Sequence, residues 1–327
     1  MVFAPAPQLT VTIEQQADAL ELHLHPGGQG VWQARMICSL GGEVVLCVAV
    51  GGEVGDVLAK LLAEEDVELR AVGRRTGTGW YVHDRRCGKR TVVADHPGQP
   101  MIRHDIDELY GVALTEGLRS DVSVLSGPAD PSVVDAEVYR RLATDLSANG
   151  RQVVADLSGP YLDAVLDGGV AFAKVSHEDL IRDGRLADDG VEALTAAARR
   201  IHAEGADSVL ISHAAGPAVA LLDGEVVIVR TPSLQAVDHR GAGDSMTAGI
   251  AAVLAAGGDV REAVRTGAAA GALNVTRHGL GTGSADAVAE LRQFVRLAAV
   301  GGGDDEADGA QGANGIGASP NGRDPAP

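Results

Sequence analysis

The chain has 327 residues, of which 45% are hydrophobic and 22% are charged, so it holds enough apolar material for one large domain or two ordinary ones. Its 27 basic residues against 45 acidic ones give a net charge of −18, which repels polyphosphate backbones and argues against nucleic acid as a partner. No run of about 18 apolar residues and no basic, apolar leader occurs. We therefore expect a cytoplasmic protein without a membrane partner.

The C-terminal segment differs in composition from the rest of the chain. Residues 301–327 contain eight Gly and three Pro with almost nothing apolar. Such a segment cannot bury enough surface to offset the entropy of ordering it. We expect one folded domain over residues 1–300 and a disordered, acidic tail over 301–327.

The first 100 residues predict α/β elements and a small β insertion. Two β-rich runs, Trp80–Asp84 and Lys89–Val93, flank a polar turn, which indicates an antiparallel hairpin. A hairpin that leaves the main sheet can cover a site at the carboxyl ends of its strands, so residues of about 10–26 and 76–95 are expected to form a lid. The other predicted elements are strands over Thr10–Ile13 and Val44–Val50 and helices over about Val31–Leu40 and Val54–Glu64.

From Asp121 onward, short β-rich runs alternate with helical patterns. This succession predicts a mostly parallel sheet covered by helices on both faces. The predicted strands are Val122–Leu125, Gln152–Asp156, Val170–Lys174 and Ser208–Ser212, the helices are Ser132–Ser147 and Asp188–Ala203, and a hairpin over Ala218–Val229 turns at Asp223-Gly224. Three Ala-rich helical stretches are expected between Gly243 and Leu297.

The sharpest motif in the chain is Gly241-Ala242-Gly243-Asp244, which follows a predicted strand and opens an Ala-rich helix. Its glycines allow a tight turn whose N–H groups point outward at the positive end of the helix dipole, which makes an anion hole. Asp244 falls in the first helical turn, where it is held as an anion and can accept a proton from a hydroxyl group.

This motif has three other possible interpretations. An isolated Asp beside a glycine turn is usually only a favourable helix-start acid. No lysine follows the glycines, so the motif is not a P-loop, and Thr247 stands where a nucleophile elbow needs its second Gly. The four-residue match and the small Ala248-Gly249 on the next turn favour a functional site.

This motif resembles the C-terminal signature of the PfkB, or ribokinase-like, carbohydrate kinases. The N-terminal glycine signature of that family resembles Gly27–Arg35, and the start of the chain is similar to the 1-phosphofructokinase and tagatose-6-phosphate kinase branch. The similarity covers residues 9–300. It implies an α/β fold with a three-layer α/β/α core, a mostly parallel sheet and a small β lid, together with ATP and Mg²⁺ as cofactors.

The resemblance also implies roles for individual residues. Asp244 becomes the catalytic base, and Gly241, Ala242 and Gly243 become the anion hole for the transferring phosphoryl group. Lys174 and Ser212, with Gly241, Gly243 and Asn274, are expected at the nucleotide. Asp179 is the expected metal-site residue, although the family's K-P-N-x-x-E element is altered here to Lys174-Val-Ser-His-Glu-Asp179.

The substrate side departs most from the family pattern. The resemblance places Asp18, Gly27, Gly28, Gln29, Trp32 and Arg90 at the acceptor, yet Gln29 and Trp32 replace a lysine and an asparagine of the family signature. The charge of a phosphosugar needs compensation when it is buried, so the lost lysine favours a neutral polyol, sugar or nucleoside over a phosphohexose. Arg35, Lys89 and Arg90 could restore the missing charge. Trp32 fits either a ligand-stacking or a core position.

Two functions therefore remain open at this point. The first is an ATP-dependent kinase that phosphorylates a hydroxymethyl group of a sugar, a sugar phosphate or a nucleoside. The second is a catalytically weak member that binds a sugar or nucleotide as a sensor, which the altered residues Ser176 and Asp179 support. A small sugar-like molecule is the expected partner in both, and a homodimer through the β lid is a further possibility.

Overall fold

The computed structural model describes residues 1–16, 19–88, 90–214, 216–232, 234, 240–276, 281 and 283–300. Predictions for Asp18, Lys89 and the tail 301–327 fall outside these residues. Within the described residues, no helix is both long enough and apolar enough to cross a membrane.

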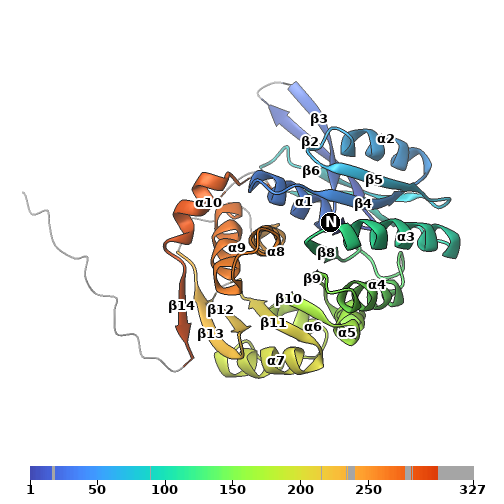
Figure 1. Ribbon diagram of the computed structural model, residues 1–327. Helices are drawn as coiled ribbons and strands as arrows, with labels where there is room; N and C mark the ends of the chain where they lie inside the picture. Colours follow the sequence, from blue (N-terminus) through green and yellow to red (C-terminus); the bar gives the residue numbers. More distant parts are fainter. Residues whose placement is uncertain are drawn as a thin grey trace, which may run out of the picture.

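A ten-stranded sheet forms the centre of the molecule (Figure 1). Its strands run in the order β14-β13-β12-β11-β10-β9-β8-β1-β4-β5, with parallel pairing from β5 to β11 and antiparallel pairing from β11 to β14. The strands are β1 (Val2–Phe3), β4 (Val45–Val50), β5 (Glu68–Gly73), β8 (Val122–Ser126), β9 (Gln152–Asp156), β10 (Val170–Ser176), β11 (Ala206–Ser212), β12 (Ala218–Leu222), β13 (Glu225–Arg230) and β14 (Arg296–Ala299).

Helices cover both faces of this sheet, and strand residues alternate between the two cores. In β4, Cys47 and Ala49 face one core while Leu46 and Val48 face the other, because successive side chains of a strand point to opposite faces. The first core is closed by α3 (Arg103–Arg119), α4 (Ala136–Ala148), α5 (Gly159–Gly168) and α7 (Val191–Glu204). The second is closed by α1 (Gln29–Ser39), α2 (Gly52–Leu62), α8 (Ala242–Ala255), α9 (Val260–Asn274) and α10 (Ala285–Arg292). The three-layer prediction is confirmed.

A smaller four-stranded sheet stands beside this core in the order β3-β2-β6-β7. It is built from β2 (Gln8–Gln16), β3 (Ala19–Gly27), β6 (Thr78–Asp84) and β7 (Thr91–Gly98). The β6–β7 pair is the predicted antiparallel hairpin, and β2 joins it by parallel pairing with β6. The small β sheet is therefore confirmed, in slightly longer strands than expected.

Several element boundaries differ from the predictions. The helix expected from Ser132 begins at Ala136, because the Asp135 side chain caps it by accepting a hydrogen bond from the Glu137 N–H at 2.8 Å. The helix expected from Asp188 begins at Val191, after a Gly190 N-cap. The last predicted helical stretch was wrong at its end, since Arg296–Ala299 forms β14 against β13. Elements with no sequence prediction are β1, β3, β5, α3, α5 and the six-residue α6 (His177–Arg182).

Close packing against α9 fixes the position of α8 relative to the main sheet. A side chain at Gly249 would bring its Cβ to 2.8 Å from Gly267 Cα of α9, so only glycine allows the two helices to approach this closely. The first turn of α8 consequently sits at the carboxyl ends of β8, β9 and β10.

Candidate active site

The first turn of α8 presents backbone N–H groups that could bind an anion. Gly241 is the N-cap residue with φ of 72°, a left-handed conformation that favours glycine. The N–H groups at the start of a helix have no intrahelical acceptor, so those of Ala242, Gly243 and Asp244 remain available at its positive end. Asn274 stabilises the turn, because its Nδ2 donates to the Arg240 carbonyl at 2.6 Å and its Oδ1 accepts from the Ser245 hydroxyl at 3.2 Å.

The carboxylate of Asp244 lies in a crowded, charged environment. Burial raises the pKa of Asp244 to about 7, and the nearby Asp156 carboxylate adds to this rise. Lys174 and a hydrogen bond with the Gln29 side chain oppose the increase. A carboxyl group with a pKa near neutrality can both accept and return a proton, which suits acid–base chemistry.

Lys174 connects the two carboxylates of this site. Its ammonium group is buried and lies 3.2 Å from Oδ1 of Asp156. Burial alone lowers the pKa of Lys174, but the carboxylates of Asp156 and Asp244 outweigh that effect and raise it. A Cβ on residue 243 would overlap Lys174 Nζ, so the glycine at that position makes room for the ammonium group beneath the anion hole.

Asp156 is the centre of a buried hydrogen-bond network that the sequence analysis did not assign to the site. Its Oδ2 accepts from Gln33 Nε2 at 2.9 Å and from the Thr247 hydroxyl at 2.8 Å. Ser126 in turn donates to Gln33 Oε1. Polar residues at the ends of β8, β9 and β10 were the available signal, because the carboxyl ends of parallel strands meet at one edge of the sheet.

A cavity of about 610 Å³ opens next to the anion hole. Its wall includes Lys174, Ser212, Ala242 and Gly243. The predicted nucleotide residues Lys174, Ser212 and Gly243 are thus brought together. Gly241 and Asn274 lie at the adjoining turn, where Asn274 is engaged in holding Arg240 and Ser245.

Asp179, the predicted metal-site residue, lies in the first turn of α6. Its Oδ2 accepts from the Ser176 hydroxyl at 2.6 Å, and its N–H donates back to Ser176 Oγ at 3.0 Å. Its Oδ1 pairs with Arg182 Nη2 at 2.7 Å. The carboxylate is therefore half-exposed and already bound to two protein groups.

The structure brings only part of the predicted acceptor set to the site. Gln29 lies there, with Oε1 accepting from the Gly127 N–H at 2.8 Å and with its hydrogen bond to Asp244. Gly28, with φ of 106°, is the N-cap of α1 and follows Gly27 at the end of β3. Trp32 is half-buried on α1, where its carbonyl lies beside Gly281.

Of the cations expected to replace the missing lysine, Arg35 is neutralised by a carboxylate, whereas Arg90 contacts an aromatic ring and keeps its charge. Arg35 forms a two-point ion pair with Glu65, in which Nε lies 2.6 Å from Oε2. The Arg90 guanidinium stacks 4.5 Å above the ring centroid of Tyr81 in the small sheet. Lys89 lies outside the described residues.

Comparison with known proteins identifies relatives over most of the chain. The model of the pfkB family carbohydrate kinases matches residues 7–287. The ATP-dependent 6-phosphofructokinase isozyme 2 of Escherichia coli (strain K12) is 31% identical over 265 residues, covering 78% of this chain and 82% of the relative. The 1-phosphofructokinase of Bacillus subtilis (strain 168) is 26% identical over 262 residues, covering 79% and 84%.

Solved structures show the same architecture. Phosphofructokinase-2 from Escherichia coli, crystallised in complex with potassium, superposes with a TM-score of 0.80 at 26% identity and covers 90% of this chain and 97% of its own. Ribokinase from Arabidopsis thaliana shares the fold, with a TM-score of 0.69 at 19% identity over 90% and 98% of the two chains. With a family match over most of its length and this shared fold, the chain belongs to the pfkB family of carbohydrate kinases and has the ribokinase-like fold.

Proposed function

We propose that this kinase transfers the γ-phosphoryl group of ATP to a hydroxymethyl group of a sugar or sugar phosphate, with Asp244 as the base. The observation that carries the proposal is the Asp244 carboxylate in the first turn of α8, with its pKa raised to about 7 by burial. Asp244 accepts the proton of the acceptor hydroxyl as its oxygen attacks the γ-phosphorus, and ADP leaves. The amides of Ala242, Gly243 and Asp244 stabilise the charge on the transferring group, with Gly241 setting the turn.

The cavity next to the anion hole is the proposed ATP site. Lys174, Ser212, Gly243 and the adjoining turn of Gly241 and Asn274 would hold the nucleotide there, and use of ATP agrees with a cytoplasmic location. Mg²⁺ is usually bound by one or two carboxylates together with substrate phosphates and several waters, and it would neutralise phosphate charge. Asp179 fits this demand, because the Ser176 and Arg182 contacts leave carboxylate lone pairs free and the side chain is 32% exposed.

The acceptor would lie against Asp244 from the side of α1 and the small sheet. We assign Gly27, Gly28, Gln29, Trp32 and Arg90 to this side. Gln29 is neutral and bonded to Gly127 and Asp244, and Arg35 is paired with Glu65, so Arg90 is left to balance the charge of a phosphate. This favours a neutral polyol, sugar or nucleoside as the acceptor, whereas the named relatives are phosphofructokinases.

A panel of acceptors decides between these classes. ADP release is measured with neutral sugars, polyols and nucleosides and with fructose 1-phosphate, fructose 6-phosphate and tagatose 6-phosphate. A neutral acceptor with the higher kcat/KM supports the charge argument. A phosphohexose preferred by more than tenfold contradicts it, and Arg90→Ala should then raise KM strongly. The sensor alternative requires ligand binding without ADP release from any acceptor.

The small sheet is the proposed lid and the proposed dimer interface. Leu20, Leu22 and Leu24 of β3 share one face and are 66%, 64% and 41% exposed. A second copy would bury these leucines, and the pairing of Val11 with Leu24 and of Ile13 with Leu22 makes the apolar strip continuous across β2. The tetrameric form of phosphofructokinase-2 from Escherichia coli shows that a relative assembles.

A further inference from the structure

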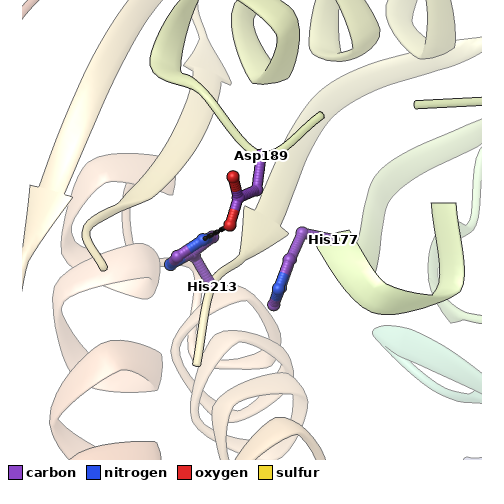
Figure 2. Close-up of side chains that lie close together, drawn as sticks. All are labelled: His177, Asp189 and His213. Carbon is purple, nitrogen blue, oxygen red and sulfur yellow. Dashed lines mark hydrogen bonds and ion pairs between the residues drawn. The ribbon is translucent and has the colours of Figure 1, made fainter. Parts of the chain in front are cut away.

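A cluster of two histidines and one aspartate lies at the carboxyl ends of β10 and β11, where both histidines line the proposed ATP cavity. His177 opens α6 directly after β10, and His213 directly follows β11, which pairs in parallel with β10. Asp189 comes from the loop before α7. Figure 2 shows the three side chains converging from these separate segments.

The spacing of the cluster is close to that of metal ligands. One nitrogen of each imidazole and one carboxylate oxygen all lie within 4.8 Å of one another. His213 Nε2 lies 3.2 Å from Asp189 Oδ2, and the two imidazole centroids are 4.2 Å apart. Ligands of a tetrahedral ion with bonds of about 2.0–2.2 Å are roughly 3.4 Å apart, so the His213–Asp189 pair already has the required separation. The spread of up to 4.8 Å within the cluster exceeds this value, so at least one side chain must move to close on the ion.

The hydrogen bonds of the cluster leave donor atoms for a ligand. The Ser212 carbonyl accepts from His177 Nδ1 at 3.3 Å, so Nε2 of His177 keeps the lone pair. A backbone carbonyl commonly fixes the tautomer of a metal-binding histidine in this way. Nδ1 of His213 is buried and has no hydrogen-bond partner in the described part of the chain. The nitrogen that faces Asp189 is Nε2, so an ion in the cluster would bind Nε2, and the unpaired Nδ1 would carry the ring proton.

We propose that His177, Asp189 and His213 form a three-ligand site for a divalent transition-metal ion of the Zn²⁺ type. Two imidazoles and one carboxylate suit Zn²⁺ or Co²⁺, whereas Mg²⁺ prefers an all-oxygen set, so the site differs from that at Asp179. Three protein ligands leave one coordination position open. Since His177 and His213 line the ATP cavity, that position faces the nucleotide and takes water or a phosphate oxygen.

The competing interpretation is a simple ion pair. In that case His213 and Asp189 only anchor the loop before α7, and the tilted contact between the two rings is ordinary packing. The two interpretations differ in Zn²⁺ affinity, because an ion pair without ligand geometry binds the ion no better than scattered surface histidines do.

The test measures Zn²⁺ binding to the full-length, untagged chain after treatment with a chelator and its removal. Competition with a chromophoric chelator should show one tight Zn²⁺ per chain, and Co²⁺ should give the visible absorption of a four-coordinate ion. His177→Ala, His213→Ala and Asp189→Asn should each weaken Zn²⁺ binding by at least tenfold. His104→Ala, at an exposed histidine of α3, is the matched control and should bind Zn²⁺ like the unchanged chain.

Two further readouts keep the test decisive. Asp189 is 61% exposed, so Asp189→Asn should fold normally. The Zn²⁺ measurement on this variant remains valid if a histidine variant fails to fold. Zn²⁺ should change the Kd of a non-hydrolysable ATP analogue in the unchanged chain and not in Asp189→Asn. This result would support an open coordination position that faces the nucleotide. Equal Zn²⁺ affinity and equal Co²⁺ spectra in the unchanged chain and in all three variants would overturn the site. Because binding is measured without turnover, this result is independent of the proposed kinase reaction.

Discussion

The carboxyl edge of the main sheet buries charged side chains, whereas the outer face of the small sheet exposes apolar ones. At the edge of the main sheet, charged groups are buried but closely paired, as Lys174 with Asp156 shows. On the small sheet, apolar side chains such as Leu20 and Leu22 face outward without cover in the described residues.

This difference indicates that the edge of the main sheet serves catalysis and that the face of the small sheet serves assembly. A buried, paired charge retains its position and acts on a substrate through an altered pKa. An exposed apolar strip stabilises nothing in the single chain and gains free energy only when another surface covers it. Substitutions at the edge should therefore change turnover, and substitutions on the strip should change assembly.

The largest effect is expected from Asp244→Asn. If Asp244 accepts the hydroxyl proton, this change should lower kcat by about 10²–10⁴-fold. ATP affinity should change little, since the anion hole is made of backbone amides. Steady-state kinetics and equilibrium nucleotide binding measure the two quantities. Asp259→Asn is the matched control at another helix start, where Asn can also act as the cap. Nearly normal turnover in Asp244→Asn would remove Asp244 from the mechanism.

Gly243→Ala should have the next largest effect. The added methyl group overlaps Lys174 Nζ and displaces it from Asp156. A shift of about 1 Å in a catalytic group can reduce the rate by about 10²-fold. Gly111→Ala on α3, where a Cβ meets nothing within 4 Å, is the control and should retain normal kcat. Equal kcat in both variants would show that the position of Lys174 is unimportant.

The pH profile should report the carboxylate pair. Burial and Asp156 raise the pKa of Asp244 to about 7, so kcat/KM should rise as pH increases through that value and the base ionises. Asp156→Asn removes one cause of the raised pKa of Asp244, so the rise of kcat/KM should occur at lower pH in this variant. The free energy of unfolding should change in the opposite direction. Between about pH 4 and 7, Asp244 is protonated in the folded chain and ionised in the unfolded chain. The contribution of Asp244 to the free energy of unfolding should therefore decrease as pH rises. A rise of kcat/KM at the same or a higher pH in Asp156→Asn would contradict the assignment of Asp244 as the base.

Disrupting the apolar strip should change assembly more than chemistry. Leu22→Asp places a charge in the proposed interface and should convert a dimer into monomers at micromolar concentration, as measured by light scattering after size-exclusion chromatography. Val57→Asp, at a 39% exposed position of α2, is the control and should remain dimeric. An unchanged chain that is already monomeric at this concentration would exclude the dimer.

The smallest effect is expected from deleting residues 301–327. Because this segment is nearly free of apolar residues, its removal should leave Tm and kcat almost unchanged. Truncation before Arg296, which also removes β14 and its pairing with β13, should lower Tm clearly. Scanning calorimetry compares the two. A loss of several degrees on removing 301–327 alone would show that the tail packs on the folded domain.

The sequence alone was most informative where local rules apply. Alternating strand and helix patterns predicted the layered fold, and Asp223-Gly224 predicted the turn between β12 and β13. Gly241–Asp244 predicted the start of α8, which lies at Ala242. Errors arose at element ends, as at Ser132, where the Asp135 cap determines the start of α4. The two-residue β1 has no pattern of its own and is a strand only because β4 and β8 pair with it.

What only the tertiary structure decided is which polar groups meet. Gln33 and Asp156 are 123 positions apart, and Thr247 and Asp156 are 91 apart, yet each pair shares a buried hydrogen bond. Strand order and the approach of α8 to α9 at Gly249 create these contacts, and residue spacing along the chain does not encode them. The sequence by itself determined the layered fold and the start of α8, because both depend on neighbouring residues. The charge environment of Asp244, and the meeting of His177 with His213, depend on burial and long-range packing, which only the folded chain supplies.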